Sequence, residues 1–175
     1  MEIEYPWYDI VDCDAPLRQG DFVNDCPVID PLSAILEYKK VPAKIIEYDV
    51  IIMSQSCDLK QRKLNLVLVC PYWELEEFEK RYDFLKSRDG KETLRRGNIP
   101  GYHLLNKCKL NGINTDYLVV DFRSVYSVPY DFLENFKKSK EKRIRLLPPY
   151  REHLSQAFAR FFMRVGLPVE IPSFK

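Results

Sequence analysis

A cysteine and an aspartate stand side by side, as Cys57 and Asp58, in a short polar segment between two apolar runs. A catalytic or redox-active cysteine reacts as its thiolate, so it needs a histidine or another positive neighbour that lowers its pKa. The chain holds two histidines, His103 and His153, and both are distant from this segment in sequence. Asp58 acts in the opposite direction, because its negative charge opposes formation of the thiolate. Cys57 and Asp58 are therefore candidates for a reaction centre if the fold brings one of these histidines to them.

The same segment is also typical of a turn between two strands. Ser54, Ser56 and Asp58 have side chains that accept hydrogen bonds from nearby backbone amides. In this interpretation the polar side chains satisfy the turn, and Cys57 is packed beneath it. Spacing does not favour a metal site here, because zinc ligands usually occur as close pairs and the five cysteines include no C-x-x-C pair. We expect no metal and no cofactor.

The apolar runs on either side of the segment predict two strands. Residues 50–53 and 64–71 are apolar with β-branched character, which is typical of strands buried on both faces. A hairpin is the simplest connection between them. An earlier strand is predicted over residues 20–29, interrupted at Pro27, and a further hairpin turn is predicted at residues 111–112, where Asn and Gly tolerate positive φ.

Three other segments have helical character. Residues 33–39 are bracketed by prolines, and residues 72–100 form an insertion with aromatic residues at a roughly helical period. Residues 150–166 place apolar side chains on one face of a C-terminal helix, which Gly166 ends.

The opposite face of this last helix carries polar residues that suit contact with phosphate. They are His153, Gln156, Arg160 and Arg164. The alternative is that they form the solvated face of a helix whose phenylalanine-rich side is buried.

Charge is distributed unevenly along the chain. Residues 1–58 hold 12 acidic and 4 basic residues, a net charge of −8, whereas residues 59–175 hold 14 acidic and 23 basic residues, a net charge of +9. This asymmetry indicates either a basic face for an anionic partner or one half of the chain docking on the other. The densest basic stretch, residues 137–145, suits a phosphate backbone, or else forms a solvated loop.

The order of several short motifs resembles the PemK/MazF-like proteins, small SH3-like barrels best known as toxins of toxin–antitoxin pairs. Residues 20–23 match the opening strand of that family, and residues 50–54 match its apolar strand that ends in serine. Residues 69–71 match the strand that ends in proline, and residues 121–125 match the late Asp-x-Arg-x-Val strand. The resemblance depends on this order, since each motif alone is common.

The resemblance covers roughly residues 18–136, interrupted by the insertion. It implies a mostly β fold with helices (α+β), in which a small SH3-like barrel carries a helical insertion and a C-terminal helix. We expect a single domain over residues 1–175. Its parts are an extended arm (1–19), the barrel (20–136) with the helical insertion (72–100), a basic segment (137–149) and the C-terminal helix (150–166).

The resemblance implies action on or near RNA, as a diverged, metal-independent endoribonuclease of a toxin–antitoxin or phage-defence system. The arginine that the family places after its first strand has no match here, because the corresponding loop offers lysines. The candidate catalytic residues are Lys44 and Arg123, which would stabilise phosphate charge, together with Cys57 and Asp58. The residues expected to contact nucleic acid are Gln55, Lys60, Arg62, Lys137, Lys138, Lys142, Arg143 and Arg145.

The alternative is a non-catalytic adaptor that keeps the barrel to bind a protein partner. The N-terminal arm and the C-terminal helix would then dock an antitoxin or a subunit of a bacterial defence complex. Scattered cysteines, an acidic N-terminus and the lack of an apolar run of about 18 residues predict a cytoplasmic protein with no membrane partner.

Overall fold

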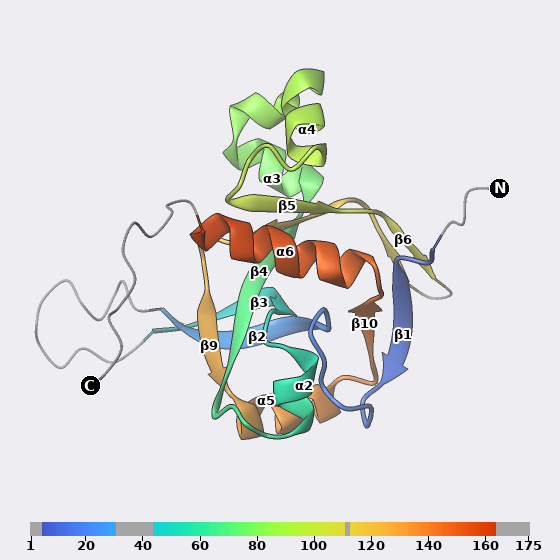
Figure 1. Cartoon of the computed structure of the whole chain (residues 1–175), viewed down its shortest axis with the longest axis vertical. Helices are drawn as coiled ribbons and strands as arrows, with labels where there is room; N and C mark the ends of the chain where they lie inside the picture. Colours follow the sequence, from blue (N-terminus) through green and yellow to red (C-terminus); the bar gives the residue numbers. More distant parts are fainter. Residues whose placement is uncertain (1–4, 31–43, 111–112, 164–175) are drawn as a thin grey trace, which may run out of the picture.

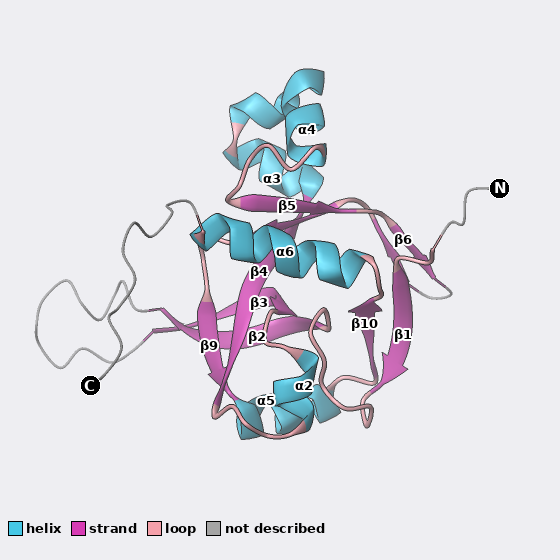
Figure 2. Cartoon of the chain, viewed as in Figure 1, coloured by secondary structure: helices cyan, strands magenta, loops and turns pink. Residues whose placement is uncertain are grey.

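The computed structural model describes residues 5–30, 44–110 and 113–163, which form a mixed α+β fold (Figures 1 and 2). Every pairing between the described strands is antiparallel. The strands are β1 (Tyr8–Asp12), β2 (Phe22–Asp30), β3 (Lys44–Ile52), β4 (Leu66–Glu74), β5 (Tyr102–Leu105), β6 (Cys108–Leu110), β7 (Ile113–Thr115), β8 (Leu118–Asp121), β9 (Tyr126–Pro129) and β10 (Lys142–Leu146). The helices are α2 (Ser56–Lys60), α3 (Leu75–Arg81), α4 (Arg88–Arg95), α5 (Tyr130–Phe136) and α6 (Tyr150–Phe162), with 3-10 turns η1 (Asp83–Lys86) and η2 (Lys137–Ser139). The helix predicted over residues 33–39 and the turn predicted at 111–112 lie outside the described residues.

Strands β3 and β4 are neighbours in the largest sheet, which confirms the pairing predicted for the two apolar runs. Val50 pairs with Pro71, and Ile52 pairs with Val69. Successive side chains of a strand point to opposite faces of the sheet. Accordingly, Ile51 packs into one hydrophobic cluster, while Val50 and Ile52 pack into another. Both faces of β3 are buried here, which explains why the run is apolar at consecutive positions.

The largest sheet has the strand order β2-β3-β4-β8-β5, with β9 also paired to β4. One half of β4, residues 66–69, pairs with β9, and the other half, residues 72–74, pairs with β8. Among the described strands no pairing joins β5 back to β2, so the sheet does not close. The SH3-like barrel expected from the resemblance is therefore not confirmed. Two further two-stranded sheets are formed by β1 with β10 and by β6 with β7.

The irregularity in β2 lies two residues before the position that we predicted. Pro27 pairs within the ladder opposite Glu47, whereas the register shifts between Val23 and Cys26. Asp25 has a positive φ of 53°, a conformation that aspartate tolerates better than most residues. The bulge therefore depends on the backbone at Asp25 and not on the proline.

The N-terminal arm and the basic segment, which we predicted separately, form one two-stranded sheet, β1–β10. A buried cluster of charges ties this sheet to the start of β2. The Asp21 carboxylate, fully buried, accepts hydrogen bonds from Arg143 Nε at 2.9 Å and from Arg145 Nη2 at 2.9 Å. The two guanidinium groups also donate to backbone carbonyls of the chain between β1 and β2, among them Asp12 and Pro16. This cluster of charges therefore connects β10 to the start of β2 and to the chain between β1 and β2.

The helices gather at two ends of the molecule and across one face. In Figure 1, α3 and α4 stand beyond β5 at one end, α2 and α5 lie at the other, and α6 crosses between them. The insertion has a hydrophobic cluster of its own, centred on Phe78, Leu85 and Leu94. Its helical part begins at Leu75, later than predicted, because β4 continues to Glu74 to complete its pairing with β8.

Helix α6 confirms the predicted C-terminal helix over its described length; residues 164–166 lie outside the described residues. Leu154 is fully buried, and Ala157, Phe158 and Phe161 pack against the cluster that contains Phe122. This packing fixes which face of α6 is turned toward the sheet and which face is left for other contacts.

Candidate functional site

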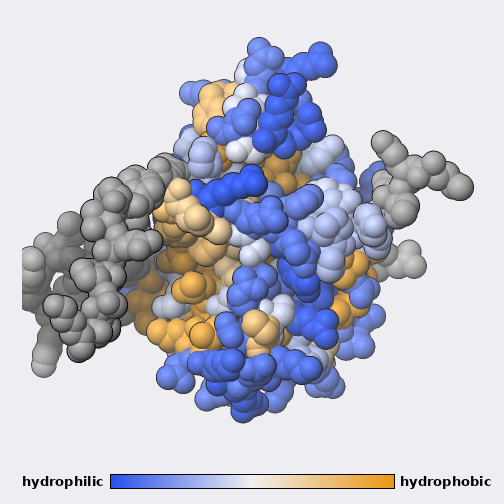
Figure 3. All heavy atoms as spheres, in the orientation of Figure 1, coloured by the Kyte–Doolittle hydropathy of each residue, from blue (hydrophilic) through white to orange (hydrophobic). Residues whose placement is uncertain are grey.

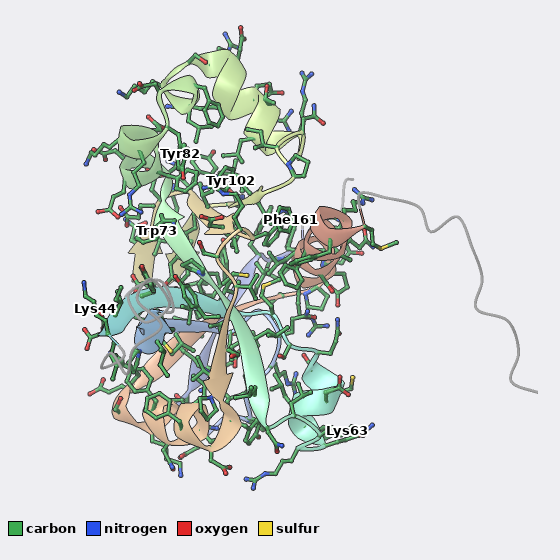
Figure 4. The ribbon with its side chains drawn as sticks, turned by 90° about the vertical axis from the view of Figure 1, so that its left-hand side faces the viewer. Lys44, Lys63, Trp73, Tyr82, Tyr102 and Phe161 are labelled. Carbon is green, nitrogen blue, oxygen red and sulfur yellow. The ribbon has the colours of Figure 1, made fainter. Side chains whose placement is uncertain are left out.

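The candidate catalytic residues taken from the resemblance are not brought to one place. Lys44 is the exposed first residue of β3, and Figure 4 places it across the molecule from Lys63, which follows α2. Cys57 and Asp58 lie on α2. Arg123 lies with Tyr82 and Tyr102, which Figure 4 shows at the end of the molecule that carries the insertion. Three separate regions therefore hold these four residues.

Arg123 is engaged by its own neighbours. Its Nε lies 3.3 Å from an Asp121 carboxylate oxygen, and its guanidinium carbon lies 4.4 Å from the centre of the Tyr102 ring. The guanidinium also donates a hydrogen bond to the Tyr82 hydroxyl. An arginine held by a carboxylate and an aromatic face fits a structural role, because part of its charge is already compensated.

The polar segment around Cys57 contains the short helix α2, so it is not the simple turn of the second interpretation. Two of its serines do accept backbone hydrogen bonds, but from amides outside the segment. Ser54 Oγ accepts a hydrogen bond from the Leu68 amide at 2.8 Å, and Ser56 Oγ accepts one from the Gln19 amide at 3.1 Å. The residue packed beneath the turn is Leu59, which is 1% exposed. Cys57 is exposed to solvent. The expectation that Cys57 would be packed under the turn is therefore wrong, because α2 points Leu59 inward in its place.

Cys57 lines a small cavity of about 350 Å³ between α2 and α6. Gln55 bridges the two elements, since its side-chain amide donates to Ser155 Oγ at 3.2 Å. Arg151 lines the same cavity, whereas the two histidines do not. The Cys57 sulfur lies 3.8 Å from an Asp58 carboxylate oxygen. Among the described residues the surroundings supply no histidine base for a cysteine nucleophile.

We expect Cys57 to be alkylated well before the buried cysteines at neutral pH. Burial raises the pKa of Cys26 to about 11 and that of Cys70 to about 12, so both are inaccessible and protonated. Timed reaction with iodoacetamide, followed by peptide mass spectrometry, measures the order. In denaturant all three should react at similar rates. Modification of Cys70 in the native protein as early as Cys57 would contradict the burial that the structure assigns to it.

The basic segment is only partly available to a partner. Lys137, Arg143 and Arg145 are buried, and each is paired within the fold. Lys137 Nζ, for example, lies 2.9 Å from a Glu134 carboxylate oxygen and donates to the Ala15 carbonyl at 3.0 Å. These three residues are set aside as nucleic-acid contacts, because reaching a phosphate would break buried ion pairs.

The remaining residues expected to contact nucleic acid are on the surface. Lys138 and Lys142 are exposed, as are Gln55, Lys60 and Arg62. Arg62 lies over the Tyr130 ring, with its guanidinium carbon 5.5 Å from the ring centre. Gln55, Lys60 and Arg62 lie on or next to α2, whereas Lys138 lies on η2 and Lys142 begins β10.

A different group of basic side chains does share a cavity, of about 580 Å³, between α4, β5 and α6. Its lining residues are Leu94, Arg95, Arg96, Gly97, Pro100, Tyr102, His103, Leu104, His153, Gln156, Ala157 and Arg160. The lining contains three arginines and two histidines, and none of these lining residues is acidic. We call this cavity the α6 groove.

The secondary structure explains how the α6 groove is built. On α6, His153, Gln156, Ala157 and Arg160 follow the spacing i, i+3, i+4, i+7, which places them on one helical face. On the other side, the end of α4 and the residue that follows it supply Arg95 and Arg96. Strand β5 supplies its residues through pairing with β8. Figure 3 shows that hydrophilic side chains cover α4 and the outer face of α6.

Glu92 holds the two arginines from α4 in position. Its carboxylate oxygens accept hydrogen bonds from Arg95 at 2.6 and 2.7 Å and from Arg96 at 2.9 Å. These two guanidinium groups hold the pKa of Glu92 at about 2. One carboxylate therefore faces two guanidinium groups, and with Arg160 the site keeps an excess of positive charge.

The two histidines of the α6 groove have different surroundings. His103 is half-buried and stacks on Phe122, with ring centres 6.1 Å apart. Burial, and to a smaller extent the nearby His153, lowers the pKa of His103 to about 4. His103 is therefore neutral at pH 7. His153 is exposed on α6, with its ring edge-on to Tyr150 at 6.2 Å.

The sequence indicated only one side of the α6 groove. The polar face of the C-terminal helix was recognised, and within it His153, Gln156 and Arg160 line the groove, while Arg164 lies outside the described residues. Arg95, Arg96 and His103 were missed. The paired arginines at the end of a short helical stretch were a usable signal, since basic residues at a helix C-terminus are left exposed. His103 stands within a strand and offered no such signal.

No family model, curated protein or solved structure matches the chain. None of the described helices is long and apolar enough to cross a membrane. The described residues also contain no group of three or more His, Cys, Asp or Glu side chains arranged to hold a metal ion.

Proposed function

We propose that this protein binds single-stranded RNA and that the α6 groove holds the phosphate backbone. The observation that carries the proposal is the convergence of three arginines and two histidines, from three separate elements, in a groove whose lining has no carboxylate. Arginine is the side chain best suited to phosphate, because its planar fork donates two parallel hydrogen bonds.

The charge on the rest of the surface supports this orientation. A second cavity, of about 370 Å³, is lined by five acidic residues and no basic residue. The acidic residues are Asp25, Glu47, Asp49, Glu74 and Glu77. An anionic chain is repelled there and attracted to the α6 groove.

An exposed aromatic side chain on α6 supports a single-stranded ligand that extends beyond the groove. Phe162 is 62% exposed and lies on a different face of α6 from the groove residues. Unpaired bases stack on exposed aromatic rings, and proteins that bind single strands combine such rings with a basic groove. A double helix keeps its base faces stacked and has no use for this ring.

The proposal includes the PemK/MazF-like relationship and a barrel-derived fold. What supports it is the order of the strands: β2, β3 and β4 are successive antiparallel neighbours, and β8, which ends at Asp121, follows beside β4. In this view the fold derives from an SH3-like barrel that has opened at β4. One half of β4 pairs with β9, and the other half pairs with β8. The helical insertion after β4 then supplies one wall of the α6 groove.

The Arg160→Ala variant and the Arg96→Ala variant should each bind a labelled single-stranded RNA roughly tenfold more weakly than the wild-type protein. This loss corresponds to about 1.4 kcal/mol of binding free energy. Each change removes one phosphate contact. The slope of the logarithm of the binding constant against the logarithm of the salt concentration should therefore decrease in magnitude by about one. Fluorescence anisotropy across a salt series measures both quantities. The control is Lys63→Ala, which removes an exposed positive charge far from the groove (Figure 4). Equal losses in the Arg160 and Lys63 variants would contradict a site in the α6 groove.

The second candidate function is a protein-binding adaptor, and a specific apolar surface favours it. Leu66 is 53% exposed and Leu68 is 41% exposed, both on β4, and Figure 3 shows an apolar area over the adjoining ends of β4 and β9. Patches of this kind often mark protein interfaces. An antitoxin or a defence-complex subunit would dock there and on α6. The N-terminal arm is less suited to docking than we expected, because Trp7 stacks on Tyr150 at 3.6 Å and β1 is paired with β10.

A further inference from the structure

We propose that His103 and His153 act as general base and general acid in a metal-independent cleavage of RNA within the α6 groove. This inference rests on the proposed function, since it requires RNA in that groove. The two histidines come from different elements, β5 and α6, and line the same cavity together with Arg96 and Arg160.

The surroundings of the two rings divide the roles between them. His103 is half-buried, and its ring stacks on Phe122. The ring is neutral at pH 7, so one of its nitrogens can accept a proton. His153 stands exposed to solvent on α6, on the opposite side of the cavity from β5. Two titratable groups held in different environments are the arrangement that acid–base catalysis requires.

The reaction proceeds by attack of a ribose 2′-hydroxyl on the adjacent phosphodiester. His103 accepts the proton of the 2′-hydroxyl as the new bond from the 2′-oxygen to phosphorus forms. The bond from phosphorus to the 5′-oxygen breaks, and His153 in its protonated form donates a proton to that oxygen. The products are a 2′,3′-cyclic phosphate and a free 5′-hydroxyl. Exchange with solvent then removes the proton from His103 and returns one to His153, so no metal or other reactant is consumed.

The arginines of the groove supply the electrostatic part of catalysis. Negative charge accumulates on the non-bridging phosphate oxygens as the fifth bond to phosphorus forms. Arg96 and Arg160 approach the cavity from opposite walls and can stabilise that charge. The bound phosphate also raises the basicity of His103, because a nearby negative charge favours its protonated form. The substrate thus strengthens the base that acts on it.

The charged and titratable groups around His103 come from every wall of the groove. Helix α4 contributes Arg95 and Arg96, β5 contributes Tyr102, and α6 contributes His153 and Arg160. Burial, with a smaller contribution from His153, keeps His103 unprotonated in the free protein. Because the pKa of His103 is lowered, we expect cleavage to persist through mildly acidic pH and to fall only as His103 gains a proton near pH 4.

The test separates binding from cleavage by using two oligonucleotides of the same sequence in the presence of EDTA. A 2′-O-methyl RNA has no attacking hydroxyl and measures binding alone, whereas the unmodified RNA measures cleavage. We expect wild-type protein to bind both and to cut only the second, leaving 2′,3′-cyclic phosphate ends detectable by mass spectrometry. The His153→Ala variant and the His103→Gln variant should each lose roughly 10²–10⁴-fold in cleavage rate, a far larger loss than in their affinity for the 2′-O-methyl RNA.

Three results decide the matter. If the wild-type protein binds the 2′-O-methyl RNA but leaves the unmodified RNA intact, the catalytic inference is wrong and RNA binding stands. If neither oligonucleotide binds, the proposed function fails and the inference fails with it. If both histidine variants cut as fast as wild type, the activity belongs to a contaminating nuclease and the inference is again overturned. His153 is exposed, so its variant tests the proposal even where the change at His103 disturbs folding.

Discussion

Replacing Asp21 with alanine is expected to lower the free energy of unfolding by about 3–5 kcal/mol, because it leaves two buried guanidinium groups without their shared carboxylate. Asp21 is fully buried, and Arg143 and Arg145 are each buried against it. The carboxylate also accepts the Arg18 amide at 3.1 Å, so the loss extends to the turn before β2. Urea denaturation followed by circular dichroism measures the change.

The control for Asp21 is an aspartate in an ion pair at the surface. Asp83 lies 2.6 Å from Lys86 on η1, with its side chain 91% exposed. Solvent screens such pairs, so Asp83→Ala should leave the urea midpoint nearly unchanged. Asp21→Asn should fall between the two, since the amide keeps the shape and one acceptor oxygen but removes the charge. A small effect of Asp21→Ala would mean that β10 does not depend on this cluster.

Replacing Gly90 with alanine should disrupt the insertion by more than the 1–3 kcal/mol typical of overpacking. A Cβ atom at Gly90 would lie 1.9 Å from the Phe84 carbonyl oxygen and 2.8 Å from its carbonyl carbon. These are backbone atoms, so no side-chain rotation relieves the clash. The Gly90 amide also donates to Ser87 Oγ at 3.0 Å, which holds the start of α4 against η1.

The effect at Gly90 should reach the RNA site. Because α4 positions Arg95 and Arg96, we expect Gly90→Ala to accelerate hydrogen exchange across residues 83–95 and to weaken RNA binding together. The control is Arg88→Ala on the same helix, an exposed position where alanine improves helix propensity. If Gly90→Ala lost its exchange protection yet bound RNA with wild-type affinity, the α4 wall of the groove would play no part in binding.

Local sequence patterns determined several elements of this protein. The continuous apolar runs at residues 50–53 and 64–71 form neighbouring antiparallel strands, since only a strand buried on both faces needs apolar side chains at successive positions. The 3.6-residue spacing of apolar side chains near the C-terminus forms α6. Such periodicities report the immediate surroundings of each residue, so they can be recognised without knowledge of the tertiary structure.

Tertiary structure alone decided which charges are available for function. Arg143 and Arg145 stand in a segment that reads as a surface for phosphate, yet both are buried because Asp21, more than a hundred residues away, compensates them. The α6 groove depends in the same way on contacts between distant parts of the chain, since Arg95 and Arg96 meet His153 and Arg160 only when the insertion folds beside the last helix. Spacing along the chain carries no information about such meetings, because electrostatic compensation acts through space and the partners are set by the packing of whole elements.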